Sequence, residues 1–136
     1  MIGLDTNVLV RYLTQDEPAQ AAIANDLIEN RLSADTPGFI AAIVLVELVW
    51  VLESAYGCDR AAISAILSRI LRAKPLRVEN AEVAWQAARA FSDGRGDFAD
   101  CMIERVANAN GCAATLTFDK IATKHAGMRL LERTNG

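Results

Sequence analysis

Four acidic residues lie beside or inside apolar runs, where a carboxylate is costly: Asp5, Glu47, Asp100 and Asp119. A carboxylate is rarely buried unless it is paired or holds a metal ion. Acids gathered from the whole length of a chain favour a hard, oxygen-ligated cation such as Mg²⁺ or Mn²⁺. The usual chemistry of such a site is the cleavage or transfer of phosphate esters. The four residues are therefore the candidate metal ligands and catalytic residues.

Two of these acids follow predicted strands. Asp5 ends the apolar segment 2–5, and Asp119 follows the strand-like segment 113–118. Ligands of open α/β sheets bind at the carboxyl ends of the strands, which favours a shared role for both residues. The alternatives are that Asp5 caps the next helix and that Asp119 forms an ordinary turn before the next helix. Capping and metal binding are compatible, because each carboxylate has two oxygens.

Glu47 lies in the longest apolar stretch, which we expect to be a buried helix over 42–55. The residues three or four positions away are all apolar: Ile43, Val44, Trp50 and Val51. No lysine or arginine of the same helix can therefore pair with it. Besides metal binding, three interpretations stay open: a partner from elsewhere, an exposed edge, or a protonated acid. We expect the neighbouring Trp50 to belong to the core.

Asp97 and Asp100 flank Phe98 where a helix is expected to begin. One of the two is expected to cap that helix, a common role of aspartate. We favour Asp100 for the site, because Met102 and Ile103 place it at the first buried turn. Asp97 is then an auxiliary ligand or the cap.

The hydrophobic pattern alternates short strands with helices. We expect strands at 2–5, 39–40, 75–78, 113–118 and 128–131, and helices at 7–13, 19–32, 42–55, 59–71, 81–91 and from Asp97 or Asp100 to about Asn110. Segment 2–5 is apolar up to its last residue, Asp5, which favours a central strand. Asp16 with Pro18 signals the start of the second helix, whose Ile23, Leu27 and Ile28 are expected to face inward. This alternation predicts an α/β fold with a parallel sheet.

Length and composition agree with one folded domain over residues 1–136. The chain has 136 residues, of which 52% are hydrophobic and 23% charged, so we do not expect disorder. A net charge of −3 argues against a general nucleic-acid coat. It does not exclude a nuclease, because a carboxylate–metal site brings negative formal charge that the cation offsets.

The cysteines and the single histidine give no zinc site. Cys58, Cys101 and Cys112 show no C-x-x-C spacing, and His125 is the one histidine of the sequence. Three free thiols agree with a reducing cytosol. No signal peptide is expected, and the longest apolar stretch is too short to span a bilayer. We therefore expect a cytoplasmic protein without a membrane partner.

Four segments together resemble a known family: LDTNVLVRYL at the start, ELVWVLE, DFADCMI leading into a helix that ends at Gly111, and LTFDK near the end. Their order, spacing and total length resemble a PIN-domain ribonuclease, specifically a VapC-type toxin of a type II toxin–antitoxin pair. The resemblance covers essentially the whole chain. Glu104 and Arg105 stand where the family more often has small residues.

The resemblance implies a PIN-like three-layer α/β fold, with a five-stranded parallel sheet flanked by helices. It implies an endoribonuclease that uses Mg²⁺ or Mn²⁺ held at Asp5, Glu47, Asp100 and Asp119. The expected auxiliary residues are Asp97 and the orienting groups Thr6, Asn7 and Thr117. It also implies an RNA substrate, a homodimer, and a cognate antitoxin protein that covers the active groove.

Three other functions remain as alternatives. A haloacid-dehalogenase-like phosphatase also has an early catalytic aspartate, but its D-x-D motif would need Asp where this chain has Asn7. A response-regulator receiver needs an acidic pair after the first strand, and only Asp5 is present there. The last is a catalytically silent PIN-like binding module, against which the complete set of acids argues.

Overall fold

The computed structural model describes residues 1–133 and divides the chain into two compact units, Met1–Ala81 and Glu82–Gly136. The prediction of a single domain over 1–136 stays a prediction. Within the described residues no helix is both long enough and apolar enough to cross a membrane.

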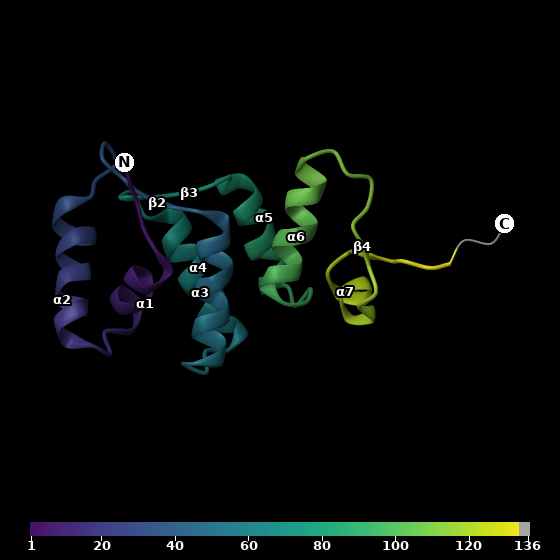
Figure 1. The fold of residues 1–136 in the computed structure, drawn as a ribbon, viewed down its shortest axis with the longest axis horizontal. Coiled ribbons are helices and arrows are strands. Elements are labelled where there is room, and N and C mark those ends of the chain that lie inside the picture. The colour runs from purple at the N-terminus through teal and green to yellow at the C-terminus, as the bar shows by residue number, and fades with distance from the viewer. Residues whose placement is uncertain (134–136) are drawn as a thin grey trace. The chain divides into compact units, whose positions relative to one another are not determined.

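The first unit is a small α/β assembly (Figure 1). Its elements in chain order are β1 (Ile2–Gly3), α1 (Thr6–Thr14), α2 (Pro18–Asp26), the π-helix η1 (Leu27–Arg31), β2 (Gly38–Ile40), α3 (Ala42–Ser54), α4 (Arg60–Arg72) and β3 (Leu76–Val78). The strands and helices predicted for this part of the sequence are confirmed, except that the last turn of the second helix is a π-helix. A single π-helical turn is rare and often marks a functional segment.

The sheet of the first unit has the order β1-β2-β3 and is parallel throughout. β2 is therefore the central strand, and the expectation of a central first strand is wrong. Ile2 on β1 is 52% exposed. The apolar character of segment 2–5 did not show that β1 has a neighbouring strand on only one side. The ladder bond from Leu4 N to Phe39 O, at 2.9 Å, holds the chain just before Asp5.

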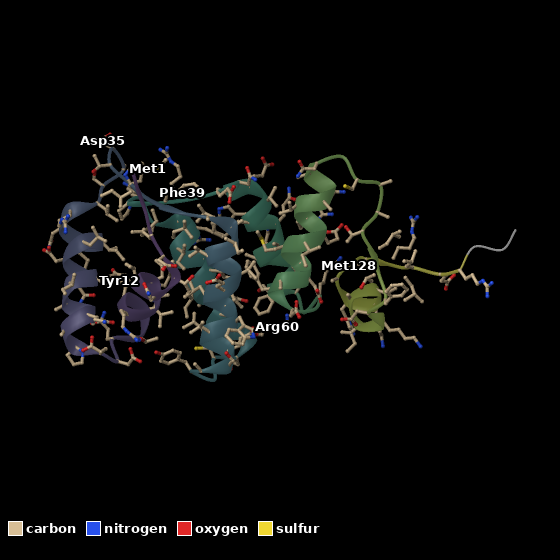
Figure 2. The ribbon with its side chains drawn as sticks, viewed as in Figure 1. Met1, Tyr12, Asp35, Phe39, Arg60 and Met128 are labelled. Atoms are coloured by element: carbon tan, nitrogen blue, oxygen red, sulfur yellow. The ribbon has the colours of Figure 1, made fainter. Side chains whose placement is uncertain are left out.

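The core of the first unit lies between the sheet and its helices. Side chains from α1, α3 and α4 fill it: Leu9, Leu45, Leu48, Leu52, Ile63 and Leu67 are each exposed by 1% or less. Burying each such side chain contributes roughly 1.5–3 kcal/mol. Figure 2 shows how densely side chains occupy the space among these helices. This packing fixes the helix starts that carry the acids of this unit.

Three apolar residues expected inside are exposed instead. Ile23 on α2 is 70% exposed, and Trp50 and Ile43 on α3 are each 68% exposed. On α2 the small Ala21 and Ala24 are buried in place of Ile23. α3 therefore has an exposed apolar stripe and is not buried on every face. Because α3 is apolar on nearly every face, the sequence did not show which of its faces packs against the core.

The second unit carries helices and a two-stranded sheet. Its elements are α5 (Ala81–Ser92), α6 (Phe98–Ala109), β4 (Leu116–Thr117), α7 (Lys120–His125) and β5 (Arg129–Leu130). The short helix α7 follows Asp119, where the turn alternative placed a helix without giving its bounds. β4 and β5 are parallel, with Leu116 beside Arg129 and Thr117 beside Leu130.

The structure does not have the predicted five-stranded sheet. The described strands form one sheet of three strands and another of two, each within its own unit. The α/β class and the parallel pairing are confirmed, and the single sheet is wrong. Strand order depends on contacts between segments far apart in the chain, which the sequence pattern does not fix.

Candidate active site

In the first unit, Thr6 links two of the predicted acids. Its backbone N–H donates to Asp5 Oδ1 at 2.8 Å, so that Asp5 is the N-cap of α1. Its hydroxyl Oγ1 donates to Glu47 Oε2 at 2.9 Å. Thr6 is only 8% exposed. One buried residue thus orients both carboxylates through neutral donors, which leave the charge of each in place.

The parallel pairing of β1 with β2 explains this arrangement. α1 follows β1 and α3 follows β2, so neighbouring strands bring two helix starts to the same edge of the sheet. Glu47 lies less than two turns into α3. It lies on the exposed side of that helix, and its partner comes from α1. The expectation of a helix buried on every face is therefore wrong, and two of the interpretations left open for Glu47, an exposed edge and a partner from elsewhere, are confirmed.

A further acid at this edge escaped the sequence analysis. Glu79, directly after β3, accepts a hydrogen bond from Ala42 N through Oε1 at 2.9 Å. The N-cap residue of α3, Ala41, has no side chain able to do this. Glu79 therefore satisfies a helix N–H that would otherwise lack a partner. Its position after a strand, like that of Asp5, was the available signal.

In the second unit, two of the predicted acids cap helices. Asp97 Oδ1 accepts from Asp100 N at 2.8 Å, which makes Asp97 the N-cap of α6. Asp119 Oδ1 accepts from Ile121 N at 2.8 Å and caps α7. Thr117 Oγ1 accepts from Asp119 N at 3.0 Å and fixes the turn before it. The capping role considered for Asp97 is confirmed, and so is the alternative that Asp119 lies in the turn before a helix.

The surroundings of Asp100 disfavour its ionised form. Burial raises its pKa above the ordinary range, and the neighbouring charges of Asp97 and Asp119 raise it further. The fold of this unit therefore brings the acids of α6 and the acid before α7 within interaction distance. No lysine or arginine is among the causes of the shift. A cation or a proton would relieve the repulsion.

The donors present suit a hard cation. Asp5, Glu47 and Asp119 each engage one carboxylate oxygen with a protein donor and keep a second oxygen without a hydrogen bond to the described residues. Carboxylate oxygen is the ligand type that Mg²⁺ and Mn²⁺ prefer. Within the described part of either unit, no three Asp, Glu, His or Cys side chains stand close enough to form a metal site by themselves. The metal-ligand assignment stays a prediction.

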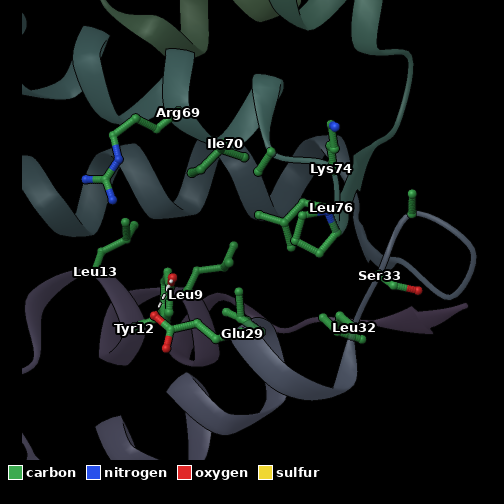
Figure 3. A pocket seen from close by; sticks show the side chains of 14 residues that line it. Leu9, Tyr12, Leu13, Glu29, Leu32, Ser33, Arg69, Ile70, Lys74 and Leu76 are labelled. Carbon is green, nitrogen blue, oxygen red and sulfur yellow. Dashed lines mark hydrogen bonds between the residues drawn. The ribbon is translucent and has the colours of Figure 1, made fainter.

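A cavity of ≈ 530 Å³ in the first unit contains none of the predicted acids. α1, η1, α4 and the segment leading to β3 line it, mostly with apolar side chains (Figure 3). Two neighbouring residues of its wall are bonded to each other: Tyr12 OH donates to Glu29 Oε1 at 3.2 Å. Burial and the hydrogen bond with Glu29 raise the pKa of Tyr12. The cavity therefore has an apolar body, with Arg69 and Lys74 among its polar wall residues.

A polar network joins α1 to the turn before α2. Arg11 Nη1 forms a salt bridge with Asp16 Oδ1 at 3.1 Å, and Tyr56 OH donates to Asp16 Oδ2 at 2.5 Å. These contacts, with the hydroxyl of Thr14, lower the pKa of Asp16; Tyr56 contributes most. Asp16 was expected to start α2, but Glu17 is the N-cap. Asp16 pairs with Tyr56 and Arg11 and does not cap α2.

The fold and the acids define a class of protein that comparison with known families identifies. The PIN domain family model matches residues 2–128, and the chain belongs to this family.

Within it, the chain is similar to a VapC ribonuclease of Aquifex aeolicus (strain VF5), with 27% identity over 117 residues, or 86% of each chain. The resemblance to a PIN-domain, VapC-type protein is therefore confirmed. No solved structure gives a significant match.

Proposed function

We propose that this chain is a Mg²⁺- or Mn²⁺-dependent endoribonuclease that acts as the toxin of a toxin–antitoxin pair. Membership of the PIN domain family and similarity to a VapC ribonuclease support the nuclease class. The observation that carries the proposal is that one buried residue, Thr6, holds the carboxylates of Asp5 and Glu47 at the same edge of the sheet. Burial, together with the charges of Asp97 and Asp119, raises the pKa of Asp100, and a bound cation would offset this shift.

In this proposal Asp5, Glu47, Asp100 and Asp119 hold the cation, with Asp97 as an auxiliary acid. When bound, the metal ion supplies a water of lowered pKa and polarises a phosphodiester oxygen. Glu47 is either a ligand or the base that accepts the proton of the attacking water.

The orienting groups keep these carboxylates in place. Thr6 donates to both acids of the first unit, and Thr117 fixes the turn that presents Asp119. Asn7, one residue further along α1, is exposed and carries an amide able to contact substrate. Hydrogen bonds of this kind typically change metal affinity or activity by 10- to 100-fold. The expected products carry a 5′-phosphate and a 3′-hydroxyl.

We also propose that the protein is a cytoplasmic homodimer that a cognate antitoxin silences by covering the active groove. The similarity to a VapC protein supports this part. Sedimentation of the purified chain tests the dimer. Co-purification of the tagged chain with the product of an adjacent gene, followed by loss of RNA cleavage on adding that product, tests the antitoxin.

The ribonuclease proposal is tested with chelator-stripped protein and total cellular RNA, with and without Mn²⁺. Metal-dependent cleavage at discrete sites, absent in the Asp5→Asn, Asp100→Asn double variant, is the expected result. Mapping the 5′-phosphate ends then identifies the target. Intact RNA with a folded, metal-binding protein contradicts the proposal and favours a silent binding module. Hydrolysis of a phosphate monoester instead favours the phosphatase alternative.

A further inference from the structure

A second pocket of the first unit lies between α1 and α2, and one of its lining residues, Asn7, is two positions after Asp5. It has a volume of ≈ 240 Å³ and is lined by Asn7, Val8 and Arg11 from α1 and by Gln20 and Ile23 among others from α2. Asp5 caps α1, so Asn7 lies in the same first turn. At 1.5 Å rise per residue, Arg11 is roughly 9 Å further along the helix axis than Asp5. Both helices belong to the unit that holds Asp5, although Asp5 itself does not line the pocket.

Hydrogen bonds fix the orientation of the polar groups in this pocket. Arg11 Nε donates to Gln20 Oε1 at 2.8 Å. A guanidinium can only donate, so the Gln20 oxygen must face Arg11 and its NH₂ group must point away from it as a free donor. The amide of Asn7 has no hydrogen-bond partner among the described residues and offers both a donor and an acceptor.

Hydrogen bonds hold the guanidinium of Arg11 in one orientation. Its bonds to Gln20, Asp16 and Tyr56 use N–H groups that lie in its plane, so none of them covers its faces. Its side chain is 31% exposed. Asp16 compensates its charge. A fixed, charge-compensated guanidinium is better suited to stacking on a neutral ring than to binding a phosphate.

The apolar part of the pocket is open to solvent. Ile23, 70% exposed, is the residue of α2 that the sequence pattern placed inside and that the structure places outside. Val8 faces it from α1 and is half-buried. The volume is below the roughly 300–1,000 Å³ of sites for drug-sized ligands, and it suits one planar ring with polar edges.

We propose that this pocket binds one unpaired base of the RNA substrate, with Arg11 stacking on the ring and Gln20 and Asn7 contacting its edge. The proposal rests on the proposed ribonuclease function and adds a base-recognition subsite next to Asp5. Unpaired bases are recognised by such stacking and by hydrogen bonds to their edges. Cleavage would then favour unpaired RNA, with a base preference at one position near the cut.

The test measures binding without cleavage, in chelator, with the full chain. The probes are fluorescein-labelled single-stranded RNA octamers of one base each and an octamer of abasic ribose phosphate; fluorescence anisotropy gives each Kd. For the wild type we expect at least one base to bind about 5- to 150-fold more tightly than the abasic chain, as one stacked base provides. Gln20→Ala and Ile23→Ser should each reduce this ratio at least fivefold and leave abasic binding unchanged.

Asn30→Ala is the matched control. It also removes an exposed amide of the α2–η1 segment, which bonds Asp26 and does not line the pocket. It should leave the ratio unchanged. Equal binding of base-containing and abasic octamers by the wild type overturns the proposal. So does a ratio that both pocket variants leave intact, because the bases then bind elsewhere.

Failure of this proposal is distinguishable from failure of the ribonuclease function. Metal-dependent cleavage without base-dependent binding would contradict the base-pocket proposal and support the ribonuclease proposal. Base-dependent binding that the pocket variants weaken, without cleavage under any metal condition, keeps the pocket as an RNA-binding site and removes the nuclease.

Discussion

The acids of the two units have opposite surroundings. In the first unit, Asp5 and Glu47 each accept a hydrogen bond from Thr6, a neutral and buried donor. In the second, Asp100 is partly buried beside Asp97 and Asp119, and its pKa is raised. Carboxylates of the first kind are oriented in advance, whereas those of the second kind repel one another. A bound cation should therefore affect the two sets of carboxylates differently.

This difference separates orientation from charge compensation. Neutral donors fix where an oxygen points without neutralising it, so the acids of the first unit gain little in fold stability from a cation. Repelling acids gain stability as soon as a cation or a proton arrives. Substitutions in the first unit should therefore change activity more than stability. Those at Asp100 should change both activity and the response of stability to metal.

The largest expected effect is on RNA cleavage. Asp5→Asn and Asp100→Asn should each lower the cleavage rate by about 10²–10⁴, the range for removing a group that handles protons or charge in the reaction. Asparagine caps a helix as well as aspartate does, so Asp5→Asn should leave the fold unchanged. The rate is measured by single-turnover cleavage of a labelled RNA from the mapped target.

The controls remove an acid of each unit outside the proposed site. Asp35→Asn in the first unit and Asp93→Asn in the second change exposed residues and should keep the cleavage rate within about twofold of wild type. Wild-type activity of Asp100→Asn would show that the crowded acids serve the fold alone, and the comparison between the units would lose its functional meaning.

The next effect is the stabilisation by metal. With Mn²⁺ at a hundred times its Kd, the free energy of unfolding should rise by about 2.7 kcal/mol. Asp100→Asn should lose most of this increase, whereas Thr6→Val should keep most of it. Thermal unfolding with chelator and with Mn²⁺ measures both.

The metal-free state gives the sign of the Asp100 effect. A raised carboxyl pKa means that the fold disfavours the ionised form, so Asp100 costs stability above its folded pKa and the cost disappears as the pH falls below its unfolded pKa. In chelator at pH 7, Asp100→Asn should therefore be at least as stable as wild type. A clear loss of stability there would contradict the crowding of these acids.

A smaller effect is expected at the threonine that joins the acids of the first unit. Thr6→Val removes the donor to Glu47 and should cost about 1 kcal/mol in stability and roughly tenfold in cleavage rate. Thr6→Ser keeps the hydroxyl and should keep most of the activity. In the second unit, Thr117 only accepts from Asp119 N, so Thr117→Val should have the smaller effect on rate. Equal losses at both threonines would remove the distinction drawn here.

Much of the local structure could be predicted from the sequence. The caps by Asp5 and Asp97 follow from an aspartate just before a helical pattern, a signal contained within a few residues. The approximate bounds of most helices follow from apolar spacing in the same way. The four acids were selected by a related argument, the position of a carboxylate relative to an apolar run.

What was missed depends on contacts between distant segments. The bond from Thr6 to Glu47 joins residues 41 positions apart, and that of Tyr56 to Asp16 joins residues 40 apart. The exposure of Ile23 depends on which face of α2 meets α1, and Ala21 and Ala24 allow the closer approach. Spacing along one helix cannot show which of two apolar faces another element covers.

The smallest predicted effect concerns the pH dependence of the first unit. Hydrogen bonds from Tyr56 and Thr14 and the charge of Arg11 hold the pKa of Asp16 below its ordinary value. A lowered carboxyl pKa gives stability that is complete above the unfolded pKa, about 3.9, and is lost as the pH falls through the folded pKa. Asp16→Asn should therefore be slightly less stable than wild type at pH 7. The difference should persist to about pH 5 and vanish in stronger acid, as urea unfolding at a series of pH values would show.

For Asp100 we predict the opposite trend: the stability advantage of Asp100→Asn over wild type should disappear as the pH falls. Parallel pH profiles for the two variants would mean that the acids of the two units do not differ in the way their neighbours indicate.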